Sequence, residues 1–277
     1  VEAAVPARFT GLNIFPMDRQ IYYDTQQRPS YNEPLKPSDV PFDQAWDKIS
    51  FRENWDPDGQ YMLLDGMGRG KHLHYDTNSI VTFVQDGERW LLDHDYLTRN
   101  TTEHTMLSVL RDGRCDTLVP GLAGLAVSGD VGDLAATRTY VRDYNGLDWE
   151  REVLWRKGAW FLVRDVVTAR AAGSYDLDLT WKTIDRDGQS VDGAGRFVAR
   201  RDSGALHIEA AEPALTWVTN HVRQGISVPV CILHQRKSAT LAPGEKAVFC
   251  SLVYATGSRY RSEYLAEAMG PGVYSLA

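Results

Sequence analysis

Short runs rich in β-branched and aromatic residues recur from residue 50 onward, and Gly, Asn and Asp separate them. Runs with turn residues at such spacing are typical of antiparallel strands. They are Gln60–Leu64, Ser79–Val84, Arg89–Leu92, Thr105–Leu110, Trp149–Trp155, Trp160–Val167, Asp176–Thr183, Arg196–Arg200, Ala205–Ala210, Val228–His234 and Ala247–Tyr254. Because such strands must bury one face against a second layer, the sequence predicts an all-β fold of stacked antiparallel sheets, a β-sandwich or supersandwich with little helix.

Two turns and two helices can be placed from local residues. Gln85-Asp86-Gly87-Glu88 and Arg156-Lys157-Gly158-Ala159 each put a glycine where a tight hairpin turn needs a positive φ. The only segments with a helical pattern are Phe42–Lys48 and Arg259–Met269.

The chain length of 277 residues suits one large β domain. Residues 1–47 are rich in Pro and Tyr, and the prolines interrupt regular elements. We therefore expect an extended lead-in over residues 1–47 and a β-sandwich domain over residues 48–277. The sequence opens at Val1 without a signal-peptide pattern, which is the form expected of a processed or excised piece.

Composition removes several functional classes. The net charge is −7 and the pI is near 5.5, so no basic face for nucleic acid is expected. No apolar run reaches the roughly 18 residues that a membrane span needs. The three cysteines are too few for a disulfide framework, although Cys231 and Cys250 could be neighbours on adjacent strands.

Candidate metal ligands concentrate in one stretch of the chain. In a strand alternate side chains share a face, so His72, His74 and Asp76 are expected to point together. The next hairpin ends at Asp93, and a further imidazole follows at His104. Two histidines and one carboxylate with an open fourth position are a common zinc arrangement. The remaining histidines, His94, His207, His221 and His234, are read as ordinary surface or hydrogen-bonded residues.

An ordered set of motifs resembles the C-terminal β-sandwich domain of the heparinase II/III-like polysaccharide lyases. The motifs are Phe51-Arg52-Glu53-Asn54-Trp55, His72-Leu73-His74-Tyr75-Asp76, Leu91-Leu92-Asp93, His104 with the following strand before Asp112-Gly113, the hairpin from Arg151 to Asp165, and Thr240-Leu241-Ala242-Pro243-Gly244-Glu245. The resemblance spans residues 45–255. Two features depart from the family: His104 is followed by Thr105 in place of Asn, and the connection from Asp93 to His104 is short.

The resemblance implies a role for each of these positions. His74, Asp93 and His104 would hold zinc, and His72 would face the substrate. Family members cleave uronic-acid polysaccharides by β-elimination, act outside the cytoplasm in a secreted or periplasmic location, and carry an N-terminal α/α-toroid domain that this chain does not include. The partner implied is therefore an anionic polysaccharide.

Local charge and the general base complete this reading. Arg52, Arg69 and Lys71 are the best sources of positive charge for an acidic sugar, and Tyr96 is the in-chain candidate for the base. Two other readings stay open: a non-catalytic carbohydrate-binding or scaffold sandwich, and a cupin-like metalloenzyme, since two histidines and a carboxylate also suit ferrous iron.

Overall fold

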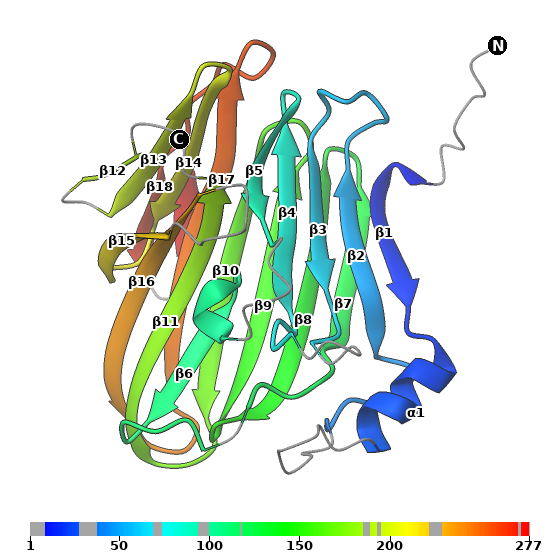
Figure 1. The fold of residues 1–277 in the computed structure, drawn as a ribbon, viewed down its shortest axis with the longest axis vertical. Helices are drawn as coiled ribbons and strands as arrows, with labels where there is room; N and C mark the ends of the chain where they lie inside the picture. The colour runs from blue at the N-terminus through cyan, green and yellow to red at the C-terminus, as the bar shows by residue number, and fades with distance from the viewer. Residues whose placement is uncertain are drawn as a thin grey trace.

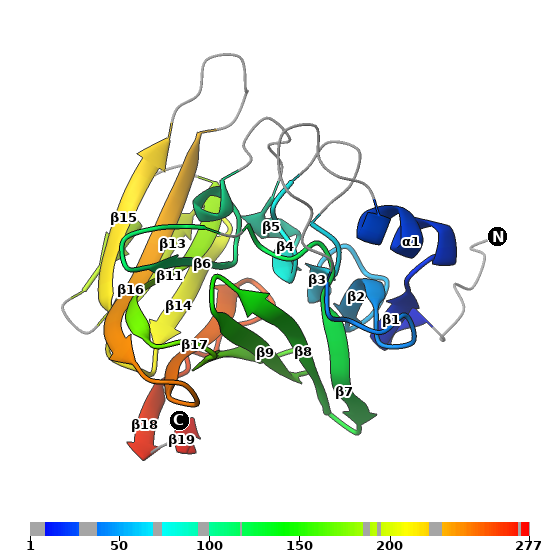
Figure 2. The ribbon, with the colours of Figure 1, turned by 90° about the horizontal axis from the view of Figure 1, so that it is seen from below.

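Two large antiparallel sheets lie face to face in the computed structural model (Figures 1 and 2). The structure describes residues 9–27, 38–68, 74–93, 100–116, 118–184, 189–192, 195–221, 229–270 and 273–276. Strand accounts for 63% of the described residues and helix for 5%. The predicted all-β fold of stacked antiparallel sheets with little helix is confirmed.

The first sheet runs in the order β1-β2-β3-β4-β5-β11-β16-β15, with β6 also paired to β11. Its strands are β1 (Gly11–Pro16), β2 (Trp46–Arg52), β3 (Tyr61–Asp65), β4 (Ser79–Gln85), β5 (Glu88–Leu92), β6 (Leu107–Arg111), β11 (Gly173–Ile184), β15 (Leu215–His221) and β16 (Val230–Leu241). The second sheet runs β12-β13-β14-β17-β10-β9-β8-β7. Its strands are β7 (Gly124–Val131), β8 (Leu134–Tyr144), β9 (Leu147–Arg156), β10 (Trp160–Ala169), β12 (Gln189–Val191), β13 (Arg196–Arg201), β14 (Gly204–Ala210) and β17 (Lys246–Gly257).

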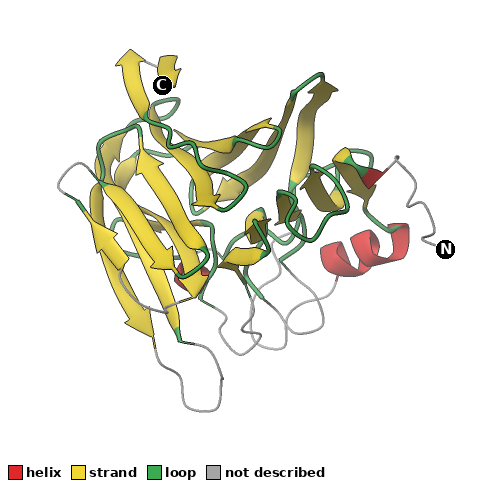
Figure 3. Cartoon of the chain, turned by 90° about the horizontal axis from the view of Figure 1, so that it is seen from above, coloured by secondary structure: helices red, strands yellow, loops and turns green. Residues whose placement is uncertain are grey.

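Few other elements accompany the sheets. A small hairpin joins β18 (Ala266–Gly270) to β19 (Val273–Leu276), and the helical elements are α1 (Arg19–Gln27) and the short 3-10 helix η2 (Thr101–Glu103) (Figure 3). Among the described residues, none of the helices has the length and apolar character that crossing a bilayer requires.

Both predicted hairpin turns form. Asp86 and Gly87 join β4 to β5 with φ of 57° and 75°, the left-handed values that a two-residue hairpin turn requires. Gly158, between β9 and β10, has φ of 68°. The turn residues therefore identify the hairpins correctly from local sequence.

Both predicted helices are wrong. Within Phe42–Lys48 a single turn precedes β2, because Trp46 and the residues after it pair with β1 and β3. Trp46 is buried in this arrangement, with 1% of its surface exposed. The end of Arg259–Met269 pairs with β19 as β18. In both segments sheet pairing outweighs a weak local helical preference.

The expected lead-in over residues 1–47 contains regular elements. Within residues 1–47 the structure shows α1 as well as β1, which extends the first sheet by pairing with β2. Cys231 and Cys250, which the sequence left open as possible neighbours on adjacent strands, do not lie on adjacent strands. Cys231 lies on β16 of the first sheet, whereas Cys250 lies on β17 of the second sheet.

The core between the sheets is strongly aromatic. Phe51 of β2 lies edge-on to Trp155 of β9 and Phe161 of β10, at centroid distances of 5.8 and 5.7 Å. Phe83 of β4 contacts Phe161 in the same way at 5.6 Å. Because these rings come from both sheets and are fully buried, they account for much of the apolar area that holds the layers together.

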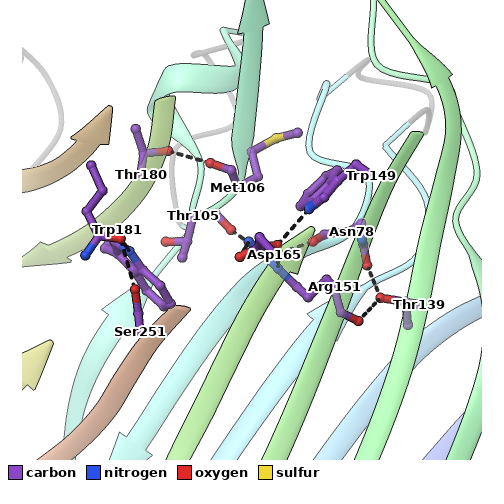
Figure 4. A network of polar contacts seen from close by, with 11 residues as sticks. Asn78, Thr105, Met106, Thr139, Trp149, Arg151, Asp165, Thr180, Trp181 and Ser251 are labelled. Carbon is purple, nitrogen blue, oxygen red and sulfur yellow. Dashed lines mark hydrogen bonds and ion pairs between the residues drawn. The ribbon is translucent and has the colours of Figure 1, made fainter. Parts of the chain in front are cut away.

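A buried ion pair interrupts this apolar core. Along β9 buried and partly exposed residues alternate, and Arg151 occupies an inward position between Trp149 and Val153. Directly across the ladder on β10, Asp165 accepts a hydrogen bond from Arg151 Nε at 2.8 Å and from Trp149 Nε1 at 2.7 Å (Figure 4). Neither Arg151 nor Asp165 has an exposed side chain. Such a pair stabilises only when both charges keep their partners.

Replacing Arg151 alone should destabilise the fold. Arg151→Met leaves the carboxylate of Asp165 buried without its cation, and we expect a loss of about 3–5 kcal/mol in the free energy of unfolding, measured by urea titration. Arg138→Met is the matched control, because Arg138 on β8 pairs with Glu152 at 2.8 Å but has a side chain that is 48% exposed; its cost should stay below about 1 kcal/mol. The double variant Arg151→Met/Asp165→Leu should recover much of the loss. Equal losses for the two single variants would contradict this account.

Candidate metal centre

Three segments of the first sheet converge at the start of β4. Asp76 precedes this strand, Asp93 follows β5, and His104 lies between η2 and β6. The backbone ties them: the Asp93 amide donates to the Val81 carbonyl at 2.8 Å, and the Ile80 amide donates to the Thr105 carbonyl at 3.0 Å. The hairpin and the strand that follows it therefore bring residues far apart in sequence to one place.

Asp76, Asp93 and His104 form the acidic and imidazole group at this point. One potential ligand atom from each lies within 4.8 Å of the others. His104 Nδ1 and Asp93 Oδ2 are hydrogen-bonded at 2.8 Å, which leaves Nε2 as the remaining ligand atom of the ring. Among the described residues, His104 Nε2 and Asp76 Oδ1 are buried and have no hydrogen-bond partner. Buried polar atoms without partners are rare in folded proteins and call for a ligand or an ion.

The pKa values of Asp76 and His104 also indicate that the group would be stabilised by a cation. Burial raises the pKa of Asp76 to about 8, with further contributions from the charges of Asp65 and Asp93. Burial lowers the pKa of His104, but the hydrogen bond and charge of Asp93 outweigh that effect, so the net pKa of His104 is raised. Two carboxylates and one imidazole thus share a buried volume in which a further cation would be stabilised.

His74 lies beside this group. Its ring is 6.2 Å from the His104 ring between centroids, in an edge-on arrangement. The expectation of a strand through this region is not met over the described residues, because His74, Tyr75 and Asp76 lie outside any strand. Tyr75 nevertheless packs into the core while Asp76 faces the group, as alternation predicted. Asp76 shares the expected face, but sequence reasoning gave it no role as a ligand.

Of the other expected site residues, the structure describes Arg52 alone. His72, Arg69, Lys71 and Tyr96 lie outside the described residues. Arg52 is at the far end of β2 from the group, since Lys48 pairs with Asp65 while Arg52 pairs with Tyr61. Its guanidinium carbon lies 4.0 Å from the centre of the Tyr61 ring and 4.4 Å from that of Trp55. Arg52 is therefore not brought to the acidic and imidazole group.

Arg151 also holds the two loops of the site. Its Nη1 donates to the Asn78 carbonyl at 2.8 Å and to the Thr105 carbonyl at 3.3 Å (Figure 4). Asn78 has a φ of 65°, and its side-chain oxygen accepts a hydrogen bond from Thr139 Oγ1 at 2.7 Å. The second sheet thus fixes the residues that follow Asp76 and His104. The signal was present in the sequence, because Arg151 stands at an inward position of an alternating strand.

Thr180 of β11 supports His104 from the other side. Its Oγ1 lies within hydrogen-bond distance of the carbonyl oxygens of His104, at 2.5 Å, and Met106, at 3.0 Å, and its single hydrogen is donated to one or shared between them. Because Thr180 is completely buried, this contact fixes the backbone that carries the imidazole.

Comparison with known proteins places the fold. No protein-family model and no curated protein matches the chain. Among solved structures, heparinase III matches with a TM-score of 0.66 at 15% identity, over 88% of this chain and 42% of that one. A heparan sulfate lyase from Pedobacter heparinus, HepC, matches with a TM-score of 0.63 at 18% identity, over 92% of this chain and 42% of that one. The Slr1438 protein of Synechocystis sp. PCC 6803 matches with a TM-score of 0.51 at 9% identity, over 83% of this chain and all of that one.

The chain therefore has the β-sandwich fold found in heparan sulfate lyases, and it spans about two fifths of their length. At these identities the likeness concerns the fold.

The raised pKa of Asp76 gives a pH-dependent prediction for metal-free protein. The unfolded carboxyl ionises near 3.8 and the folded one near 8, so the folded state binds more protons between these values and stability falls as pH rises. Asp76→Asn cannot ionise. We expect its free energy of unfolding, relative to that of the parent protein, to rise by on the order of a few kcal/mol between about pH 5 and about pH 8. Urea titrations in the presence of a chelator at several pH values measure this. A difference that does not change with pH would contradict the assignment.

Proposed function

We propose that this chain is the metal-holding β-sandwich part of a secreted or periplasmic polysaccharide lyase that cleaves a uronic-acid-containing polysaccharide by β-elimination. The observation that carries the proposal is the partly buried Asp76, Asp93 and His104 group, in which Asp76 Oδ1 and His104 Nε2 are buried and have no hydrogen-bond partner, on a fold shared with heparan sulfate lyases. The family resemblance of the motifs around His74 and His104 supports the same assignment.

The donor set fits zinc. Zinc accepts imidazole nitrogen and carboxylate oxygen and favours four ligands. We propose Asp76, Asp93 and His104 as ligands, with the neighbouring His74 completing the set. When bound, the ion supplies the positive charge that the two buried carboxylates lack and links the segments before β4, after β5 and before β6. The hydrogen bond from His104 to Asp93 orients the imidazole for this role.

The remaining roles follow from the chemistry of β-elimination. A base removes the proton next to the uronate carboxylate, and the charge that develops needs preorganised stabilisation. His72, two residues before His74, is proposed to face the substrate and stabilise that charge, while Arg69 and Lys71 attract the acidic chain. The base is either Tyr96 or a residue on the proposed α/α-toroid domain, which would supply the opposite wall of the cleft.

The metal assignment predicts one bound zinc ion. Elemental analysis of the purified chain should find about one zinc per molecule, because three suitable ligands converge and His74 lies beside them. Asp93→Ala and His104→Ala should each lose the ion. His207→Ala is the matched control, since His207 is a buried histidine on β14 of the other sheet and should leave the metal content unchanged. Full zinc content in His104→Ala would contradict the site, and comparison of His74→Ala with Asp76→Ala shows which of the two binds more strongly.

The lyase assignment predicts a divided active site. The complete gene product and this chain are each incubated with alginate, heparan sulfate, hyaluronan and ulvan, and the unsaturated uronate product is followed by its ultraviolet absorbance. We expect elimination by the complete product and activity lower by orders of magnitude for this chain alone, because base and charge-stabilising group must be held on the substrate together.

Variants of the complete product separate catalysis from folding. His72→Ala should abolish turnover with the melting temperature unchanged, whereas His74→Ala should lower both, since a metal ligand is lost. Strong elimination by the isolated chain would overturn the divided site and make Tyr96 the first residue to test. Absence of elimination by the complete product on every polymer would overturn the lyase assignment and favour a carbohydrate-binding role.

A further inference from the structure

A second polar cluster lies on the same face of the first sheet as the metal centre. We call it the Trp217 cluster; its members are Trp217 of β15, His234 and Arg236 of β16, and Asp178 of β11. In the register, His234 stands opposite Trp217 on one side and Thr180 on the other. Because Asp178 and Thr180 are two residues apart on β11, they share a face, and Thr180 contacts the carbonyl of His104 on that face.

The histidine of the cluster is held at both ring nitrogens. His234 Nδ1 is hydrogen-bonded to Asp178 Oδ2 at 3.1 Å, and Nε2 to Thr219 Oγ1 at 2.9 Å. The Trp217 ring stacks on this fixed imidazole at 4.7 Å between centroids, with an interplanar angle of 3°. The indole is therefore held upright on the sheet, with one flat side against the histidine.

Arg236 is positioned by the same residues. Its Nη2 donates to Asp178 Oδ2 at 3.3 Å, and its guanidinium carbon lies 4.8 Å from the centre of the Trp217 ring. The side chain of Arg236 remains 43% exposed, whereas Asp178 is 7% exposed and His234 10%. Buried residues thus orient a guanidinium that keeps donors available to solvent.

Trp217 stands on the edge strand of the first sheet. Trp217 is half-buried, and β15 is the last strand of its sheet, so among the described residues no further strand of that sheet stands beside it. A flat aromatic ring suits the apolar C–H face of a pyranose, and a neighbouring guanidinium suits a carboxylate or a sulfate.

The cluster is close to the metal centre. Thr180 bridges the two, since it contacts the His104 carbonyl and pairs with His234 across a strand spacing of about 5 Å. A polysaccharide lying across this face could contact both regions with neighbouring sugar residues.

We propose that the Trp217 cluster is a subsite that binds an acidic pyranose residue of the polysaccharide, with Trp217 stacking on the ring and Arg236 pairing with its anionic group. This inference rests on the proposed function for the class of polymer that it names. It assigns a role to His234 and Asp178 as positioning residues and to Trp217 and Arg236 as binding residues.

Calorimetric titration of this chain tests the subsite without turnover. The probes are hexasaccharides of alginate, which carries carboxylates alone, of heparan sulfate, which also carries sulfates, and of neutral maltose units. We expect binding of at least one acidic probe and not of the neutral one. Trp217→Ala and Arg236→Gln should each weaken that binding by about tenfold, and Trp217→Phe should restore part of it. The preferred acidic probe identifies the anionic group.

Arg142→Gln is the matched control, because Arg142 on the second sheet also stacks on an aromatic ring, that of Tyr140 at 4.3 Å, and also pairs with carboxylates. It should bind as tightly as the parent chain. Parent-like binding by both Trp217→Ala and Arg236→Gln, or equal weakening by Arg142→Gln, would overturn the subsite. If no acidic probe binds while the complete gene product still performs elimination, the subsite is wrong and the proposed function stands.

Discussion

The positive charge of Arg151 lies inside the apolar core, and much of the architecture is arranged around it. Asp165 neutralises it across the β9 and β10 ladder, and two of its guanidinium nitrogens contact that carboxylate. Its Nη1 reaches segments of the other sheet, where it donates to the carbonyls of Asn78 and Thr105. Packing of aromatic rings brings the layers together, but this guanidinium fixes their relative placement, because its hydrogen bonds have direction and apolar contacts do not.

The candidate metal centre depends on that placement. Asn78 and Thr105 are two residues after Asp76 and one residue after His104, respectively. Holding their carbonyls therefore holds the loops whose side chains form the candidate site. Because the second sheet holds these loops in place, two carboxylates and an imidazole remain close together although burial removes water from each of them. In the Trp217 cluster, buried Asp178 and His234 likewise orient Arg236 and Trp217.

Local patterns predicted the parts of the fold that depend on neighbouring residues. Alternation placed β9 and β10, and the Asp86-Gly87 turn located a hairpin, because both signals act over a few positions. The Phe42 segment was misassigned because Trp46 pairs with Pro16 of β1, a strand far earlier in the chain. The end of the Arg259 segment was misassigned although its partner β19 follows directly in the chain, because hairpin pairing outweighs its local helical preference. The approach of Asp93 and His104 and the face shared by His74 and Asp76 were expected, whereas the irregular backbone of residues 74–76 and the place of Asp76 among the candidate ligands were not.

The order of strands in the first sheet has a consequence for how the chain reaches this state. β11 is placed between β5 and β16, so Thr183 pairs with Leu91 across nearly a hundred intervening residues. Such distant pairings form slowly, since loop closure must precede the contacts that reward it. His104 is fixed by Thr180 of this same strand. The candidate site therefore matures only once the centre of the sheet has closed, so the geometry of Asp76, Asp93 and His104 is among the last features of the fold to form.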